Sequence, residues 1–170
     1  MFRWLKVLVV ASALATVAAC GSDDDDDASR DRNVVQQAQA DSRFSILAEA
    51  VAAADLATTL SGTGPFTVFA PTNEAFASLL AELGVTQAQL LADKPLLTKV
   101  LTYHVVAGQV LKAEVPVGVP IKTLQGGTFT VDSALSITDQ RGRSSRIVET
   151  DVVVSNGVIH AIDKVLLPAP

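Results

Sequence analysis

The spacing of apolar residues changes once along this chain, near Val105, and this change constrains the fold more than any other feature. Before it, apolar side chains recur with the 3.6-residue period of a helix, as Phe44, Leu47 and Val51 do. After it, short apolar runs alternate with Gly, Pro and Asn-Gly turns, a pattern typical of strands joined by tight turns. The sequence therefore predicts an α+β fold, with several helices first and a mostly antiparallel sheet after them.

Capping residues mark the ends of the expected helices. Thr86 with Gln89 has the pattern of a capping box, and Asp93 precedes a segment with Pro95 in its first turn. Gly84 stands where a helix favours glycine after its last turn. We expect helices at residues 34–40 and 43–54, between Thr72 or Asn73 and Gly84, from Thr86 to Leu91, and from Asp93 to His104.

Turn residues divide the rest of the chain into short strands. The clearest unit is a hairpin around Asn156 and Gly157, for which a type I′ turn is expected because both residue types accept positive φ. The strands are expected at residues 66–70, 121–124, 128–132, 135–138, 146–150, 152–155, 158–162 and 165–167.

The first nineteen residues have the pattern of an export signal. Arg3 and Lys6 precede an apolar stretch at residues 7–19, which as a helix reaches about 20 Å and falls short of the ~30 Å hydrocarbon core of a membrane. A secretory signal peptide at residues 1–19 fits this length. The stretch ends at Cys20 and resembles the lipobox of bacterial lipoproteins. That resemblance implies cleavage before Cys20, a diacylglycerol on its thiol and an acylated amine. An ordinary signal peptide followed by a chance cysteine is the alternative.

Residues 20–32 are interpreted as the lipidated cysteine and an acidic tether. The five aspartates Asp23–Asp27 repel one another and bury nothing, which favours a solvated spacer. Calcium capture and a surface-export signal are the alternative interpretations. Gly21, rather than an aspartate, follows Cys20, and by the lipoprotein resemblance this favours an outer membrane where the organism has one. Residues 33–168 remain as one domain.

Charge and cysteine content exclude several classes of function. The chain has 13 Lys and Arg against 18 Asp and Glu, a formal net charge of −5. This balance opposes nucleic-acid binding, which needs a cationic surface to displace counterions. A single cysteine forms neither an internal disulfide nor a cysteine-based zinc site.

The two histidines, His104 and His160, do not stand in a catalytic motif. Ser155 and Asp151 lie near His160, but no nucleophile elbow and no pair of metal-ligand histidines occurs. We expect His160 to be a hydrogen-bonded core residue and His104 to satisfy carbonyls at a helix end. The expectation is a non-enzyme with no catalytic residue, no cofactor and no metal.

Arg141, Arg143 and Arg146 form a local basic cluster in an acidic protein. The first interpretation is a solvated hairpin tip. The functional alternative is a site for an anionic partner, such as a polysaccharide or a phosphate headgroup.

Three sequence boxes resemble the fasciclin (FAS1) domain family. They are residues 67–76 (TVFAPTNEAF), residues 103–106 (YHVV) and residues 156–168 (NGVIHAIDKVLLP). The resemblance covers about residues 33–168 and implies a wedge-shaped β-sandwich of mostly antiparallel strands with several N-terminal helices packed against it. It also implies adhesion or ligand binding. By the same resemblance, Tyr103, His104 and Asp163 are candidate partner-binding residues, although Lys164 stands where animal relatives have an aliphatic residue.

Taken together, the sequence predicts an exported fasciclin-domain protein that Cys20 anchors by lipid in the bacterial cell envelope. The expected role is adhesion, with a cell-surface protein or a matrix polysaccharide as partner. A small-molecule carrier or accessory lipoprotein of the envelope is the alternative.

Overall fold

The structure is a computed structural model, and it describes residues 30–170. The expected signal peptide, Cys20 and Asp23–Asp27 lie outside the described residues. Helices dominate the first half of the described part and strands the second half, so the predicted α+β fold class is confirmed.

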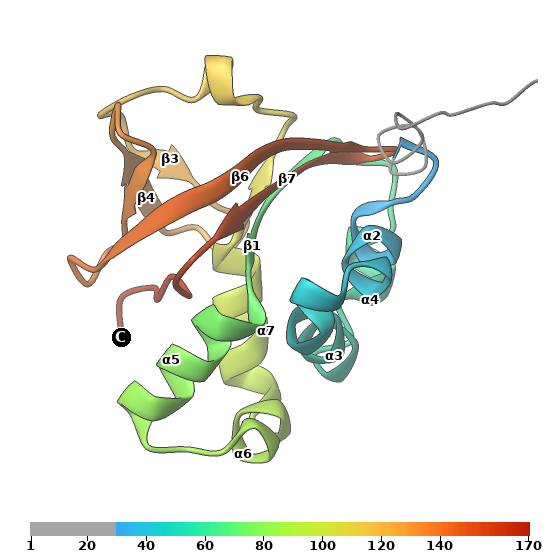
Figure 1. Ribbon diagram of the computed structural model, residues 1–170, viewed down its shortest axis with the longest axis vertical. Coiled ribbons are helices and arrows are strands. Elements are labelled where there is room, and N and C mark those ends of the chain that lie inside the picture. The colour runs from blue at the N-terminus through green and yellow to red at the C-terminus, as the bar shows by residue number, and fades with distance from the viewer. Residues whose placement is uncertain (1–29) are drawn as a thin grey trace, which may run out of the picture.

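The helices form two groups that share one core on the same face of the sheet, and Figure 1 shows both groups below the long strands. Thr72, Thr86 and Asp93 cap helices through their side chains, and Gly84 ends one in the left-handed conformation, as predicted. The expected helix at residues 43–54 begins instead with a separate 3-10 turn, because the Asp41 side chain caps that turn by accepting from the Arg43 amide. The first group is α2 (Val34–Ala40), η1 (Ser42–Phe44), α3 (Ser45–Ala53) and α4 (Ala57–Leu60), and the second is α5 (Asn73–Leu83), α6 (Gln87–Ala92) and α7 (Lys94–Tyr103).

The strands form one mixed sheet in the order β2-β1-β7-β6-β5-β4-β3. The β1–β7 pair is parallel, and the other neighbouring pairs are antiparallel. Beyond β3, the Leu124 amide donates to the Val105 carbonyl at 2.8 Å, which nearly closes the sheet. The strands are β1 (Phe66–Pro71), β2 (Val105–Ala107), β3 (Ile121–Lys122), β4 (Thr128–Val131), β5 (Ser136–Thr138), β6 (Ser144–Val154) and β7 (Gly157–Ile162), with a 3-10 turn η2 (Lys112–Glu114) between β2 and β3.

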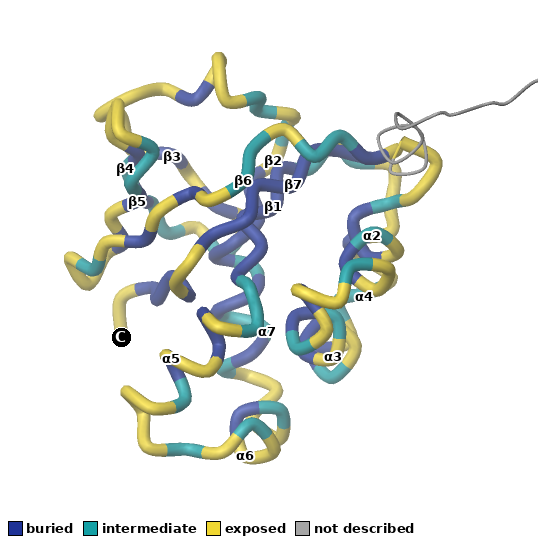
Figure 2. The backbone as a smooth tube through the Cα atoms, in the orientation of Figure 1, coloured by how far each residue is buried: buried dark blue, intermediate teal, exposed yellow. Residues whose placement is uncertain are grey.

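Strands β1 and β7 are buried on both faces and divide the interior into two cores. Val68 and Ala161 face the core against the helices, whereas Phe69 and Ile162 face a second core inside the curled sheet. Figure 2 shows both strands as a dark blue centre. Burial on both faces is typical of parallel strands.

The strand predictions are wrong in two places. Residues 146–150 and 152–155 belong to one continuous strand, β6, because two register shifts against β7 absorb the irregular backbone around Asp151, which has φ 61°. Residues 165–167 form no strand. They run as buried irregular backbone, and side chains satisfy two of their amides: His104 accepts from Leu166 and Asp139 accepts from Leu167.

The predicted hairpin is present, but its turn is not type I′. Ser155 and Asn156 occupy the turn, since Val154 pairs with Gly157, and neither turn residue has positive φ. The Asn156 side chain instead makes three hydrogen bonds to distant backbone. Its Oδ1 accepts from the Val34 amide at 2.9 Å, and its Nδ2 donates to the carbonyls of Leu60 and Gly62 at 2.8 and 2.9 Å.

Substituting Asn156 by alanine is expected to lower the free energy of unfolding by about 2–4 kcal/mol, because it leaves three backbone groups in two distant segments without their partner. Ser155→Ala, an exposed neighbour in the same turn, is the control and is expected to change it by less than about 0.5 kcal/mol. Urea unfolding of both variants measures the difference. Equal effects at the two positions would contradict the role given to Asn156.

Candidate functional site

Tyr103, the first residue of the predicted partner-binding pair, is completely buried at the end of α7. Its hydroxyl donates to the Thr128 carbonyl at 2.7 Å and accepts from the Gln140 amide at 3.2 Å. Burial raises the pKa of the Tyr103 phenol to about 12. The ring therefore joins α7 to β4 and to the end of β5.

His104 follows it and is 1% exposed. Its Nδ1 lies 2.7 Å from the Val100 carbonyl, and its Nε2 accepts from the Leu166 amide at 2.9 Å. These partners assign the proton to Nδ1 and leave the ring neutral. Burial lowers the pKa of His104 to about 4. The imidazole satisfies the end of α7, as predicted, and also ties the C-terminal segment to it.

His160 is the hydrogen-bonded core residue that the sequence predicted. Its Nε2 donates to the Val110 carbonyl at 2.9 Å, and its Nδ1 accepts from the Asp151 amide at 3.3 Å. The ring lies 5.4 Å from that of Phe69. Burial lowers the pKa of His160, so this ring too is neutral near pH 7.

These contacts give the Tyr103–His104 pair a structural role. Both side chains are inaccessible, so a partner would reach them only after local opening of the domain. Among residues 30–170, no three His, Cys, Asp or Glu side chains gather in a group that could hold a metal ion.

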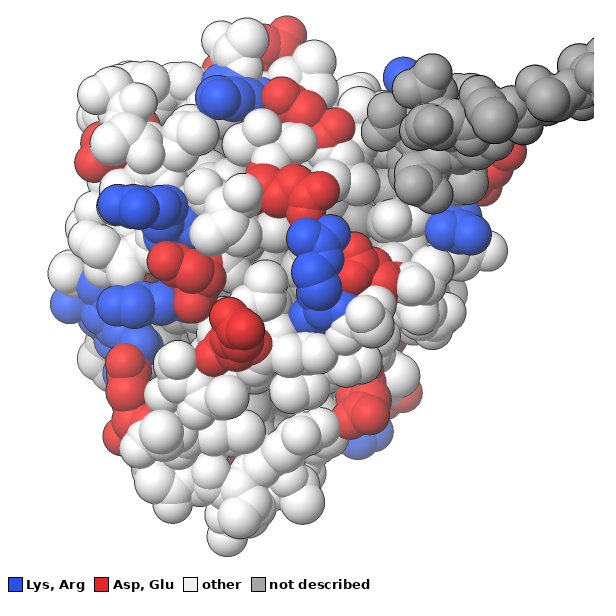
Figure 3. All heavy atoms as spheres, viewed as in Figure 1, with Lys and Arg blue, Asp and Glu red and all other residues white. Residues whose placement is uncertain are grey.

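The three arginines of the basic cluster have different environments. Arg141 Nε donates to the Pro168 carbonyl at 3.0 Å, and Arg143 forms an ion pair with Glu82 of α5. The Arg146 side chain is exposed, and within the described residues no hydrogen bond or ion pair holds it. In Figure 3, basic and acidic side chains alternate near the left margin of the molecule. Two of the three cations are therefore already occupied.

Asp163, the remaining candidate, is exposed at the end of β7. One carboxylate oxygen accepts from the Arg146 amide at 2.8 Å and from the Ser145 hydroxyl at 3.2 Å. The structure thus brings Asp163, just after the end of β7, beside Arg146 of β6. Neither the Tyr103 nor the His104 side chain forms a hydrogen bond with Asp163 in the described residues.

Sequence reasoning missed Asp139, a buried carboxylate that organises the β5–β6 turn. Its Oδ1 accepts from the Arg141 and Arg143 amides, both at 2.9 Å, and its Oδ2 accepts from the Leu167 amide at 3.0 Å. An Asp followed three residues later by Gly142 is a turn signal that could have identified the local part of this role. The bond to Leu167 has no local signal.

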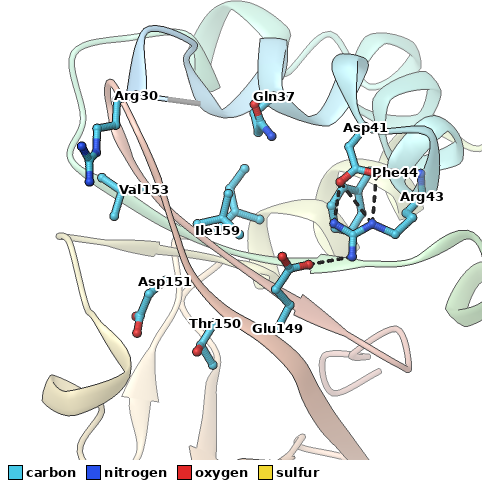
Figure 4. Close-up of a pocket in the computed structure, with 11 residues that line it drawn as sticks. Arg30, Gln37, Asp41, Arg43, Phe44, Glu149, Thr150, Asp151, Val153 and Ile159 are labelled. Atoms are coloured by element: carbon cyan, nitrogen blue, oxygen red, sulfur yellow. Dashed lines mark hydrogen bonds and ion pairs between the residues drawn. The ribbon is translucent and has the colours of Figure 1, made fainter. Parts of the chain in front are cut away.

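A surface groove of about 260 Å³ lies between α2, η1 and β6, and Figure 4 shows its lining. Arg43 occupies one end, with its guanidinium 2.6 Å from both Asp41 and Glu149 and 5.4 Å above the Phe44 ring. The Arg43 guanidinium holds the pKa of Asp41 below its usual value. Because two carboxylates already neutralise Arg43, this end of the groove is a poor site for an anion.

The core between the helices and the sheet contains a small apolar cavity beside His104. Its volume is about 20 Å³, enough for roughly one water molecule. This cavity cannot admit a small-molecule ligand.

Comparison with known proteins identifies the family. The fasciclin domain profile matches residues 42–168, and the chain belongs to this family. It is 44% identical over 138 residues to Protein sll1483 of Synechocystis sp., covering 79% of this chain and 73% of that protein. It is 37% identical over 135 residues to the transforming growth factor-beta-induced protein ig-h3 of Sus scrofa, covering 79% of this chain and 19% of that protein.

A solved structure has the same fold. It is the fasciclin domain pair from the insect cell adhesion molecule fasciclin I, with a TM-score of 0.73 and 17% sequence identity over 81% of this chain and 51% of that one. In the part of the chain that the structure describes, no helix has the length and apolar character needed to cross a membrane.

The neutral, buried histidines predict that stability depends on pH. Both rings protonate near pH 6.5 in the unfolded chain but resist protonation when folded, so the unfolded state binds more protons below pH 6.5. The free energy of unfolding is therefore expected to fall as pH falls from 6.5 towards 4, by about 2–3 kcal/mol from His104 alone.

Urea unfolding at pH 7 and pH 4.5 measures this loss. His104→Gln is expected to be less stable at pH 7 but to lose less stability between the two pH values. An identical pH dependence in the variant and the natural chain would contradict the assignment.

Proposed function

We propose that this chain is a lipid-anchored adhesion protein of the bacterial cell envelope. The observation that carries the proposal is the order of its parts: a family-defining fasciclin domain at residues 42–168 follows Cys20, which ends an apolar segment of signal-peptide length, and the acidic run Asp23–Asp27. In this arrangement the lipid fixes the protein, the acidic run acts as a solvated spacer, and the domain recognises a partner.

Adhesion is favoured because the domain shares its fold with part of an insect cell adhesion molecule. The interior supports a binding role rather than a catalytic one. The polar side-chain atoms of three residues form hydrogen bonds with backbone groups: Tyr103, His104 and His160. None of these side chains is therefore available as a general acid or base at the surface.

Stable anchoring requires more than one acyl chain. At about 0.8 kcal/mol for each buried CH₂ group, a single chain holds a protein only marginally, and two or three hold it firmly. Acylation of both the thiol and the amine of Cys20 supplies that number. Where the organism has an outer membrane, Gly21 favours that location, and display on its outer surface would bring the domain within reach of a cell-surface protein or matrix polysaccharide.

Cys20→Ser is expected to release the protein from the membrane fraction, because serine offers no thiol for the diacylglycerol. Cell fractionation and incorporation of a labelled fatty acid measure the two effects. Ser22→Ala, two residues away, is the matched control and is expected to stay anchored and labelled. A Cys20→Ser protein that remains in the membrane fraction would contradict lipid anchoring.

Cells that produce the Cys20→Ser form are also expected to attach to surfaces or aggregate less than cells with the natural chain. Normal attachment by cells that lack the gene altogether would overturn the adhesion role and leave the anchoring result untouched.

A further inference from the structure

The outward face of strands β3–β6 carries hydroxyl and cationic side chains in a regular array. On these strands, the alternate residues Phe129, Val131, Ile137 and Ile147 point into the core. The residues between them point outward: Lys122 on β3, Thr128 and Thr130 on β4, Ser136 and Thr138 on β5, and Ser144 and Arg146 on β6. We call these seven residues the hydroxyl face.

The sheet register arranges the hydroxyl face in rows. Thr130, Thr138 and Ser144 lie directly opposite one another on three adjacent strands, about 4.8 Å apart from strand to strand. Lys122 pairs with Thr128 on one side of this row, and Ser136 pairs with Arg146 on the other. One cation therefore lies near each end of the array.

None of the seven side chains makes a hydrogen bond or ion pair with another group in residues 30–170. The two carboxylates at its border are engaged: Asp132 accepts from the amides of Ala134 and Ser136, and Asp163 accepts from the Arg146 amide. The hydroxyl face thus presents unpaired hydroxyl groups and two unpaired cations, bordered by the charged carboxylates of Asp132 and Asp163.

We propose that the hydroxyl face binds an acidic polysaccharide, which names the partner class for the adhesion role proposed above and rests on it. Lys122 and Arg146 would bind carboxylate or sulfate groups of successive sugars, and the Thr130–Thr138–Ser144 row would hydrogen-bond to sugar hydroxyl and ring oxygens. Charge complementarity selects an anionic chain, and the hydroxyl row selects one that is rich in oxygen acceptors along its length.

The composition of the hydroxyl face argues against a protein partner. The centre of a protein interface is rich in aromatic and aliphatic side chains, whereas the seven residues of this face include none, and the exposed aliphatic residues Val117, Leu124 and Val148 lie outside it. Two cations are too few for a nucleic acid, whose binding depends on neutralising many phosphates.

The position of the hydroxyl face suits presentation to a polymer outside the cell. Figure 1 shows β3 and β4 at the opposite end of the molecule from α2, where the described chain begins. The described chain therefore enters the domain away from β3 and β4.

Affinity electrophoresis of the full chain tests the proposal, with polygalacturonate, dextran sulfate, neutral dextran or poly-L-glutamate in the gel. Polygalacturonate, dextran sulfate or both are expected to retard the chain, which identifies carboxylate or sulfate as the preferred group. Retardation is expected to weaken as salt rises from 50 to 300 mM. No retardation by either acidic polysaccharide, or equal retardation by neutral dextran or poly-L-glutamate, would overturn the proposal.

Variants locate the site on the molecule. Lys122→Gln with Arg146→Gln is expected to weaken binding at least tenfold, and Thr130→Val with Thr138→Val about fivefold. The control removes two charges from α7, Lys94→Gln with Lys99→Gln, and is expected to change binding by less than twofold. Equal losses in the control and in the Lys122/Arg146 variant would show general attraction and overturn the proposal.

The same variants separate this proposal from the adhesion role. Cells that carry an anchored Lys122→Gln, Arg146→Gln chain are expected to attach poorly. Normal attachment by these cells, together with loss of attachment in cells lacking the gene, would overturn the hydroxyl face and leave adhesion standing.

Discussion

The parallel pairing of β1 with β7 is the interaction on which the rest of the structure depends. It joins residues 91 positions apart in six consecutive pairs, from Phe66 with Gly157 to Pro71 with Ile162. The approach is so close that a Cβ atom on Gly157 would lie 1.9 Å from the Phe66 carbonyl oxygen, which only glycine avoids. Each of the two cores packs against one face of this pair, so both cores need it in place.

Buried polar side chains form the hydrogen bonds that backbone groups outside the strands would otherwise lack. The segments that enter and leave β1 and β7 are irregular, and their amides and carbonyls need partners in the interior. Asn156, His104, His160 and Asp139 supply them, and in the described chain no buried side-chain nitrogen or oxygen lacks a hydrogen-bond partner. This use of the histidines explains why residues that resemble a recognition motif lie inside. The recognition that we propose uses side chains that the interior does not need, those of the hydroxyl face.

Local patterns predicted the helices, their caps and the hairpin well, because capping by Thr86 or Asp93 acts within four residues. Local sequence patterns could not predict contacts between residues far apart in the chain. The turn at Asn156 follows from bonds to Val34, Leu60 and Gly62 rather than from its residue types, and the Asp139–Leu167 bond links a turn to irregular backbone 28 residues away. The hydroxyl face was also missed, since its rows exist only once the register of four strands is known, whereas Arg141 and Arg143 stood out in sequence but are occupied in the structure.

Native-state amide hydrogen exchange tests the central claim most directly. If the β1–β7 pair supports both cores, the amides of Phe66–Ala70 and Gly157–Ile162 can exchange only when the whole domain unfolds. Their opening free energies are then expected to equal the global free energy of unfolding and to decrease with urea at the same slope. Exchange of these amides through a local opening, at a lower free energy than the amides of α7, would contradict the account.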